Sequence, residues 1–334
     1  MTRPRIALAL GDPAGIGPEI ALKALLDDQV WALCEPLLVG EAEVLRRHAA
    51  PCGIAVTAHN DGTLTIGNRR VALEPVAAGG GAVPLAQVSP EAGRATVAYA
   101  RRAIELALAG RVDAVVACPH NETAVNRGGL AFDGYPGFLA DVAGVPRDQV
   151  FLMLVSERFR IVNVTLHVAL RQALDLLTVE RIVTAAHAAQ RALSRLGIAH
   201  PRIGVCGINP HAGEHGLFGD EDDTIVRPAV ARARAEGLDI AEPVGADALL
   251  AGGGYDVYLA MYHDQAHIPI KLLGIGASSG MPIGTPVLFS SVPHGSAFDI
   301  VGKNQANADA ITNTLKRLAA RAAAEGASAP AAQA

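Results

Sequence analysis

The stretch RIALALGDPAGIGPEI (residues 5–20) joins an apolar, strand-like run to a helix through a turn rich in glycine and proline. Pro18 stands in the first turn of that helix, where the proline ring fits and its missing N–H is not needed. The same order, a short apolar run followed by an alanine-rich helical stretch, repeats almost to the end of the chain. Alternation of this kind predicts an α/β fold with largely parallel, doubly wound sheets.

The expected strands are short apolar runs bounded by turn residues: 5–10, 36–40, 113–119, 150–156, 160–166, 202–208, 256–262 and 286–292, with a small β-ribbon at 54–74. The expected helices begin near Pro18 and otherwise cover residues 41–50, 89–110, 168–176, 179–196, 224–236 and 305–325. The signal is strongest at 89–110, because Ser89 supplies a cap and Pro90 follows at the first helical position. A chain of 334 residues exceeds what one core usually fills, which predicts two lobes.

The composition is typical of a compact α/β enzyme. Half of the residues are hydrophobic and only 18% are charged, which excludes a disordered chain. The net charge of −5 and the lack of a Lys/Arg-rich tract argue against a nucleic-acid partner. The N-terminus has only five consecutive apolar residues, too few for a signal sequence or a membrane span. Because the four cysteines show no CxxC spacing, we expect a cytoplasmic enzyme with reduced thiols.

The glycines of the turn after the first strand fall at positions 11, 15 and 17. This spacing is not GxGxxG, and no Lys-Ser or Lys-Thr pair follows as in a P-loop. The turn is therefore as consistent with a tight strand-to-helix connection as with a phosphate-binding loop. Asp12 and Glu19 remain candidates for lining a cleft.

Three histidines stand in polar stretches that follow apolar, strand-like runs: His167 in VNVTLH, His211 in GINPHAGE and His263 in AMYHDQAH. Strand ends are where α/β sheets present their chemistry, and imidazole is the commonest side-chain ligand of transition metals. If the three converge, they form an open metal site that polarises a substrate oxygen. Asp247 and Asp264 offer carboxylates, as further ligands or as hydrogen-bond partners of the histidines.

The C-terminal run HGSAFDIVGK (294–303), followed by Asn307, resembles the adenosine-binding loop of the isocitrate and isopropylmalate class of β-decarboxylating dehydrogenases. This resemblance implies that His294 and Asn307 lie near an adenine and Asp299 near its ribose. A carboxylate accepts hydrogen bonds from ribose hydroxyls and repels a 2′-phosphate, which favours NAD over NADP. The implied cofactor-binding residues are His294, Gly295, Ser296, Ala297, Asp299 and Asn307.

From GDPAGIGPE through NPHAGE and YHDQ to HGSAFDI, the chain resembles the pyridoxal-biosynthesis family of 4-hydroxythreonine-4-phosphate dehydrogenase. The resemblance implies a two-lobed α/β/α fold of the isocitrate/isopropylmalate dehydrogenase type. It also implies that His167, His211 and His263 bind a divalent metal, usually zinc, at a homodimer interface. The family reaction oxidises a hydroxyl β to a carboxylate with NAD, and the β-keto acid then loses CO₂. A Lewis-acidic metal suits both steps.

The chain departs from that family at the positions implied to hold the substrate phosphate. Gly134-Tyr135-Pro136-Gly137 replaces a Gly-His-Thr-Glu run, and Glu122 replaces a lysine. Gapless alignment puts Gly280 and Phe289 at the family's substrate-contacting Asn and Arg, and only Lys271 is retained. A phosphate dianion needs donors and positive charge, so a phosphorylated substrate fits poorly.

The variant motifs resemble the terephthalate dihydrodiol dehydrogenases, above all in CPHNETAVNRGGLAFDGYPGFLA (118–140) and HDQAHIPIKLL (263–273). This resemblance implies oxidation of 1,2-dihydroxy-3,5-cyclohexadiene-1,4-dicarboxylate and loss of CO₂ to give protocatechuate. A flat ring with two carboxylates needs cationic or amide anchors and an apolar wall. The candidate substrate-binding residues are His120, Asn121, Arg127, Tyr135, Phe138 and Lys271.

We therefore expect a metal-dependent, NAD-linked dihydrodiol dicarboxylate dehydrogenase with Lys271, Asp247 and Asp264 as catalytic residues. A lysine beside a bound dication has its pKa lowered towards a proton-relay role. A discontinuous first lobe (1–130 and 293–334) is expected to carry much of the NAD site, and residues 131–292 the metal and the homodimer interface. Two alternatives stay open: the same chemistry on 4-hydroxythreonine 4-phosphate or a related phosphorylated 3-hydroxy acid, and a protein that binds metal or nucleotide without catalysis.

Overall fold

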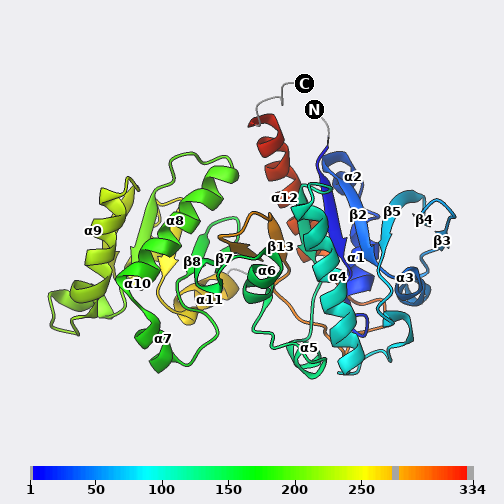
Figure 1. Cartoon of the computed structure of the whole chain (residues 1–334), viewed down its shortest axis with the longest axis horizontal. Helices are drawn as coiled ribbons and strands as arrows, with labels where there is room; N and C mark the ends of the chain where they lie inside the picture. The colour runs from blue at the N-terminus through cyan, green and yellow to red at the C-terminus, as the bar shows by residue number, and fades with distance from the viewer. Residues whose placement is uncertain (1–2, 273–277, 329–334) are drawn as a thin grey trace. The chain divides into compact units, whose positions relative to one another are not determined.

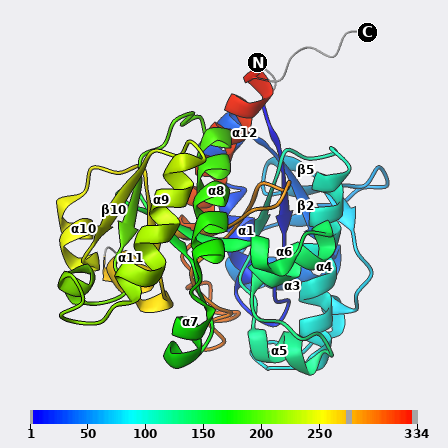
Figure 2. The same ribbon diagram turned by 60° about the vertical axis from the view of Figure 1, so that its left-hand side comes forward.

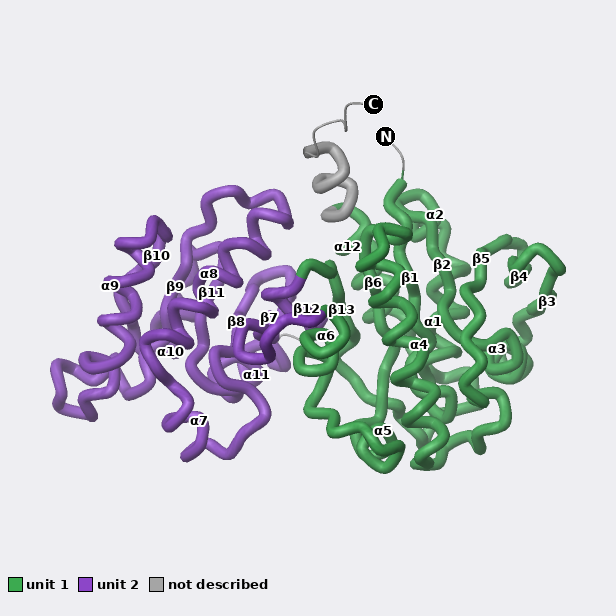
Figure 3. The backbone as a smooth tube through the Cα atoms, viewed as in Figure 1, with its two compact units in different colours: residues 1–143, 286–334 green, residues 144–285 purple. Residues whose placement is uncertain are grey.

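The computed structural model describes residues 3–272 and 278–328, and the side chains up to residue 320. The chain divides into two compact units, Met1–Ala143 with Pro286–Ala334 (unit 1) and Gly144–Thr285 (unit 2), as Figure 3 shows. The sequence analysis instead placed α6 (Tyr135–Ala143) and β13 (Phe289–Ser291) in the second lobe. Both lie in unit 1, because α6 packs against α4 (Pro90–Leu108) and β13 pairs with β6 (Ala114–Ala117).

The sheet of unit 1 has the order β13-β6-β1-β2-β5-β4-β3. The first five strands in this order are parallel, and the last two add the antiparallel ribbon predicted at 54–74. The remaining strand bounds are β1 Arg5–Ala9, β2 Glu35–Gly40, β3 Val56–Ala58, β4 Thr63–Ile66 and β5 Arg69–Pro75. Strand β6 is buried along its whole length, as expected of a parallel strand covered on both faces.

Helices of unit 1 cover this sheet (Figure 1). Helix α4 packs on β1, β2 and β6, and α12 packs on β6 and β13 and on helices α1 and α2. As predicted, Ser89 caps α4, since its hydroxyl oxygen accepts a hydrogen bond from the N–H of Ala92 (3.1 Å). The other helix bounds are α1 Gly17–Ala24, α2 Asp28–Leu33, α3 Ala42–Ala49, α5 Glu122–Arg127 and α12 Asp309–Ser328, with single 3₁₀ turns η1 (Ala50–Cys52) and η2 (Gly80–Ala82).

The sheet of unit 2 has the order β10-β9-β11-β8-β7-β12. The first four of these strands are parallel, and β7 and β12 are antiparallel to their neighbours. The strand bounds are β7 Phe151–Val155, β8 Arg160–Asn163, β9 Ile203–Cys206, β10 Ile240–Val244, β11 Val257–Ala260 and β12 Ser279–Ile283. The chain direction thus reverses at β7 and again at β12, and sheets that mix parallel and antiparallel pairs in this way are common in α/β proteins.

Helices α8 and α9 of unit 2 pack against each other (Figure 2). Helix α11 packs on β7, β8 and β11, and its Ala266 and Ile270 join an apolar core. The helix bounds are α7 Leu170–Leu176, α8 Val179–Arg195, α9 Arg227–Ala235, α10 Ala246–Gly252 and α11 His263–Leu272, with the short turns η3 (Arg147–Gln149), η4 (Pro210–Glu214) and η5 (Asp222–Val226). The predicted class, largely parallel α/β sheets with helices, is confirmed.

Two further observations concern the cysteines and the membrane. All four cysteines are unpaired thiols, and burial raises the pKa of Cys34 to about 11. None of the helices within the described residues is long and apolar enough to cross a membrane.

Candidate active site

The three histidines singled out in the sequence all follow adjacent parallel strands of unit 2. His167 comes after β8, His211 after β9, and His263 after β11, and these strands have the order β9-β11-β8. Parallel strands end at the same edge of a sheet, so the histidines share that edge. One detail differs from the expectation of a polar loop, because His263 is the first residue of helix α11.

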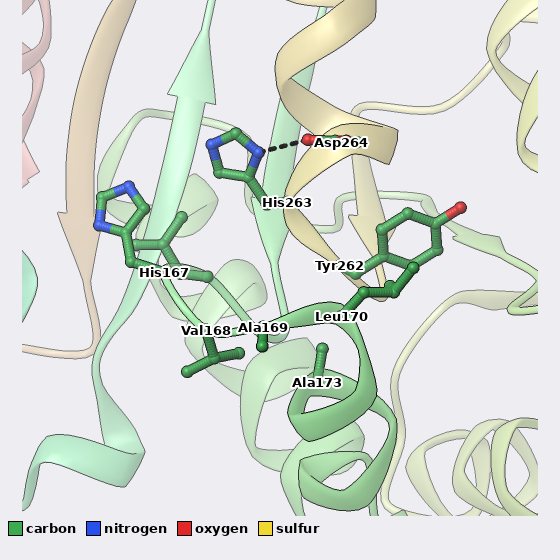
Figure 4. A pocket seen from close by; sticks show the side chains of 9 residues that line it. His167, Val168, Ala169, Leu170, Ala173, Tyr262, His263 and Asp264 are labelled. Carbon is green, nitrogen blue, oxygen red and sulfur yellow. Dashed lines mark hydrogen bonds and ion pairs between the residues drawn. The ribbon is translucent and has the colours of Figure 1, made fainter.

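The structure distributes these histidines over two pockets. His167 and His263 line one of about 420 Å³ together with Asp264, and their ring centroids lie 5.7 Å apart (Figure 4). His211 and Asp247 line a second of about 290 Å³, and Tyr262 borders both. Among the described residues, no three His, Cys, Asp or Glu side chains are grouped so as to hold a metal ion. A single chain therefore brings two of the three predicted ligands into one pocket.

Helix α11 organises the first pocket. The Nδ1 of His263 donates to Oδ1 of Asp264 (2.7 Å), which leaves Nε2 of that ring as the acceptor. His267, one turn later, stacks on His263 with centroids 3.7 Å apart and planes inclined by 12°. Burial lowers the pKa of His267 to about 3, helped by His263, Lys271 and His167 nearby. The buried Nε2 of His267 has no hydrogen-bond partner among the described residues.

Sequence reasoning missed His267. The signal was available, since His263, His267 and Lys271 recur at intervals of four and so share one face of a helix. It was overlooked because the segment was assigned to a loop. The exposed Lys271 is close enough to His267 to influence its titration, which places it on the same face.

His211 is held in a strained turn. It has φ 54°, and Ala212, Glu214 and His215 also have positive φ values, between 44° and 56°. Such left-handed backbone is unfavourable for residues other than glycine. The buried carboxylate of Asp222 fixes the start of this turn, because it accepts hydrogen bonds from the N–H groups of Ile208 (2.8 Å) and Asn209 (2.9 Å). The local conformation is thus imposed by a residue well beyond the turn in the chain.

The substrate-binding candidates of unit 1 surround an aromatic cluster of His120, Phe132, Tyr135 and Phe289. His120 is half-buried, and its ring lies 4.6 Å from that of Tyr135 and 5.0 Å from that of Phe132. Tyr135 is only 4% exposed and Phe289 fully buried, with their ring centroids 4.9 Å apart. Burial raises the pKa of the Tyr135 phenol, whose hydroxyl has no hydrogen-bond partner among the described residues. This cluster packs as an apolar wall beneath His120.

The other candidates of unit 1 differ in exposure. Asn121 caps α5, because its Oδ1 accepts from the N–H of Ala124 (2.9 Å). Arg127 is exposed in the last turn of that helix, whereas Phe138 is 3% exposed. Among these candidates of unit 1, Arg127 is exposed and His120 and Asn121 are half-buried, whereas Tyr135 and Phe138 are buried.

Residues 294–307, which the sequence predicts to bind a cofactor and which we call the cofactor loop, include exposed and buried side chains. Gly295 and Asp299 are exposed, whereas Ser296 is 4% exposed and its hydroxyl donates to Oδ2 of Asp12 (2.6 Å). Burial lowers the pKa of His294. The Oδ1 of Asn307 accepts from the N–H of Asp309 (2.6 Å) at the start of α12. The hydroxyl of Ser296 and the amide of Asn307 are thus already used within the protein.

Asp12 and Glu19 do not line a cleft. Their side chains are 0% and 1% exposed. Both are hydrogen-bonded to the cofactor loop, Asp12 to Ser296 and Glu19 to the N–H of Ala306 (3.1 Å). The turn between β1 and α1 is therefore packed against the loop rather than open to a ligand.

Comparison with known proteins identifies relatives along nearly the whole chain. The family profile of the pyridoxal phosphate biosynthetic protein PdxA matches residues 32–318. The 1,2-dihydroxy-3,5-cyclohexadiene-1,4-dicarboxylate dehydrogenase of Comamonas sp is 45% identical over 95% of this chain and 98% of that protein. The D-threonate 4-phosphate dehydrogenase of Cupriavidus necator is 39% identical over 94% and 96%, respectively. A crystal structure of a 4-hydroxythreonine-4-phosphate dehydrogenase from Burkholderia phymatum has TM-score 0.81 and 35% identity over 96% of this chain and 99% of its own.

Proposed function

This chain belongs to the family of the pyridoxal phosphate biosynthetic protein PdxA and is an oxidoreductase, and we propose that it oxidises and decarboxylates a cis-dihydrodiol dicarboxylate with NAD. The substrate proposed is 1,2-dihydroxy-3,5-cyclohexadiene-1,4-dicarboxylate, and the product is protocatechuate. The relative from Comamonas sp, at 45% identity, bears the name of a dehydrogenase of that dihydrodiol.

One observation carries the choice of substrate: an apolar, aromatic cluster occupies the positions implied to hold a phosphate. Tyr135 and Pro136 stand where the resemblance implies His and Thr, and Phe289 where it implies Arg. Tyr135 and Phe289 are buried against each other, so neither offers a donor to an anion at the surface. A phosphate dianion bound there would lose several charge-assisted hydrogen bonds. The planar carbon ring of the dihydrodiol needs no hydrogen bonds on its face, so it can pack against an apolar wall.

The chemistry of the donors around His263 fits a divalent cation such as zinc. Metal-binding histidines generally donate their second ring N–H to a carboxylate, and the bond from His263 to Asp264 has that form. His167 in the same pocket and His211 beside Asp247 are the further ligands proposed. The stacking of His267 on His263 holds the ligand ring in place.

A second copy of the chain is proposed to complete this site. One chain groups only two of the three histidines, as described above. Large apolar side chains near both pockets are exposed in the single chain, among them Leu170 (59%), Leu217 (71%) and Phe218 (47%). Exposed apolar surface of this kind marks an interface, and a homodimer is the simplest one.

The reaction balances with NAD as the oxidant. The chemistry that the bound groups would supply is acceptance of the C2 hydride by NAD and acidification of the C2 hydroxyl by a divalent cation, which His167, His211 and His263 would hold. The hydroxyl proton leaves to a base, for which Asp247 and Lys271, both exposed, are the proposed residues. The bond between C1 and its carboxylate then breaks and CO₂ leaves; the electron pair forms a double bond between C1 and C2, the C2 oxygen takes up a proton, and the ring becomes aromatic. Asp264 is proposed to orient His263 rather than to move a proton, because its oxygen is already bonded to that ring.

The test is an assay of NADH formation with the dihydrodiol and with 4-hydroxythreonine 4-phosphate, before and after chelation and with zinc restored. We expect faster turnover of the dihydrodiol, loss of activity on chelation, and loss in His211→Ala. His187→Ala is the matched control, since His187 lies in the same unit, outside both pockets, and forms an ion pair with Glu236 (2.6 Å). Preference for the phosphorylated substrate would overturn the substrate, and activity that survives chelation and His211→Ala would overturn the metal.

A further inference from the structure

We propose that the turn at residues 11–19 is the platform that fixes the cofactor loop, and that Asp12 is a positioning residue for NAD binding. This inference rests on the proposed function, which places NAD on that loop. It assigns a role to the motif GDPAGIGPE, which matches neither a dinucleotide-binding nor a P-loop pattern.

The first connection joins Asp12 to Ser296. The two side chains are 0% and 4% exposed, and the serine hydroxyl donates to Oδ2 of the carboxylate at 2.6 Å. The other oxygen, Oδ1, accepts from the N–H of Ala14 (2.8 Å). Burial raises the pKa of Asp12, because removing the carboxylate from water costs free energy, which its hydrogen bonds partly offset. Through these two hydrogen bonds the carboxylate of Asp12 fixes the position of Ser296 relative to the turn.

Close backbone packing supports the same connection. The N–H of Ile16 donates to the carbonyl oxygen of Ser296 (2.9 Å). A Cβ on Gly15 would lie 2.6 Å from the Cβ of Ser296 and 2.8 Å from its carbonyl oxygen, so only glycine permits this approach. Phe298 of the loop packs against the apolar cluster of Ala14, Val83 and Ala92. The loop is therefore seated directly on the turn.

The second connection holds the other end of the loop. Oε1 of Glu19, a side chain only 1% exposed, accepts from the N–H of Ala306 (3.1 Å) and from Nζ of Lys23 (2.8 Å). The same Nζ donates to the carbonyl oxygen of Ala306 (2.8 Å). Both backbone groups of Ala306 are thus paired with helix α1. Because the turn is bonded to Ser296 and helix α1 to Ala306, both ends of the segment 297–305 are fixed.

Helix α3 holds the turn through hydrogen bonds to Pro13. The carbonyl oxygen of Pro13 accepts hydrogen bonds from Nη2 of Arg47 and from Nε2 of His48, each 3.0 Å long. Both donors lie on helix α3. The exposed Asp299 of the loop makes no hydrogen bond or ion pair with any described residue. Its carboxylate is therefore available to the hydroxyls of an adenosine ribose, which is the chemistry that the loop would recognise.

The experiment measures NAD binding to the full chain by calorimetry in Asp12→Ala, Asp12→Asn and Ser296→Ala. Removing either half of the Asp12–Ser296 bond should raise the Kd for NAD by about tenfold or more. Asp12→Asn should stay within about threefold, because an amide still accepts from Ala14 and donates to the serine oxygen. Its kcat should also be kept, whereas a catalytic carboxylate would lose kcat in this variant. Asp113→Ala is the matched control, since Asp113 likewise accepts a backbone N–H, that of Arg5 (2.7 Å).

Hydrogen exchange in the NAD-free protein provides the second readout. Peptides covering residues 294–307 should exchange faster in Asp12→Ala and in Ser296→Ala than in the wild type or in Asp113→Ala. Unchanged exchange in the loop, or unchanged NAD affinity in both variants, would overturn the inference. If the wild type itself does not bind NAD, the proposed function fails, and the exchange data still decide whether the turn fixes the loop.

Discussion

Replacing Asp222 by asparagine should destabilise unit 2 and loosen the turn that carries His211. The carboxylate of Asp222, which is fully buried, accepts the N–H groups of Ile208 and Asn209 at 2.8 and 2.9 Å. Asparagine has one side-chain oxygen, so one of the two backbone N–H groups keeps a hydrogen bond, now to a neutral acceptor. The other N–H group faces the N–H₂ of the amide and loses its acceptor. Losing a bond to a charged group, worth about 1.5–3 kcal/mol, and leaving a donor unpaired gives a loss of about 3 kcal/mol.

The strain of the turn adds to this effect. Four residues other than glycine have positive φ between residues 211 and 215, and left-handed backbone costs about 1–2 kcal/mol at each. The total of about 4–8 kcal/mol must be offset by the contacts around the turn. The two hydrogen bonds to the buried carboxylate of Asp222 are among these contacts. When Asp222 is replaced, the strain of the turn is no longer fully offset, so the turn should relax and change the position of His211.

Urea unfolding followed by circular dichroism measures the change, with the fluorescence of Trp31, the sole tryptophan, as the reference for unit 1. Asp223→Asn is the control, because Asp223 is partly exposed and forms an i,i+4 ion pair with Arg227, worth about 0.3–0.5 kcal/mol. Hydrogen exchange at residues 207–216 should rise only in Asp222→Asn. Equal stability of the two variants, or an unchanged exchange rate in the turn, would refute the account of how His211 is held.

Three further changes probe unit 1. Gly93→Ala puts a Cβ 2.0 Å from the carbonyl oxygen of Ala124, so α4 and α5 must separate; urea unfolding should show a loss of about 3 kcal/mol, and a loss under about 1 kcal/mol would contradict this packing. Burial acts to raise the pKa of Glu41, but hydrogen bonds from the N–H groups of Ala78, Gly80 and Gly81 and from a tyrosine hydroxyl outweigh it and hold the pKa below 4.5. The stabilisation by this carboxylate is complete above pH 4.5 and is lost as the pH falls through the lower folded-state pKa, so Glu41→Gln should flatten the acid side of a plot of stability against pH. Ser89→Ala should cost α4 about 1 kcal/mol, measured by thermal unfolding, and no change would argue against the cap.

The sequence predicted the elements whose local signals and tertiary surroundings agree. The runs at 5–10 and 113–119 became β1 and β6, since consecutive apolar residues suit a strand buried on both faces. The cap at Ser89 and the ribbon at 54–74 were also found where the residues indicated. Strand β10 was missed, because Pro243 interrupts its pattern and a strand at the edge of a sheet tolerates proline.

Helix α11 was missed for a related reason. Its sequence HDQAHIPIKL is polar at the start and contains Pro269, so no apolar period of 3.6 residues is visible. It forms because Ala266 and Ile270, four residues apart, anchor one face in the core of unit 2. Tertiary packing thus overrides weak propensity, and no count of local signals reveals it.

The candidate site shows the same limit in sharper form. That three histidines follow neighbouring strands could be inferred from the sequence, because strand order decides which edge they share. Which pocket each enters could not, because it depends on contacts distant in the chain: Asp222 twists the turn of His211, and α11 turns His263 towards His167. The buried carboxylates follow the same rule. The sequence offered Asp12 and Glu19 as candidates for lining a cleft and gave no sign of Asp222, yet each of the three accepts backbone or hydroxyl hydrogen bonds that hold a neighbouring segment. In this fold, buried acids hold the segments that carry His211 and the predicted cofactor-binding residues, and mutational tests restricted to the histidines would not detect them.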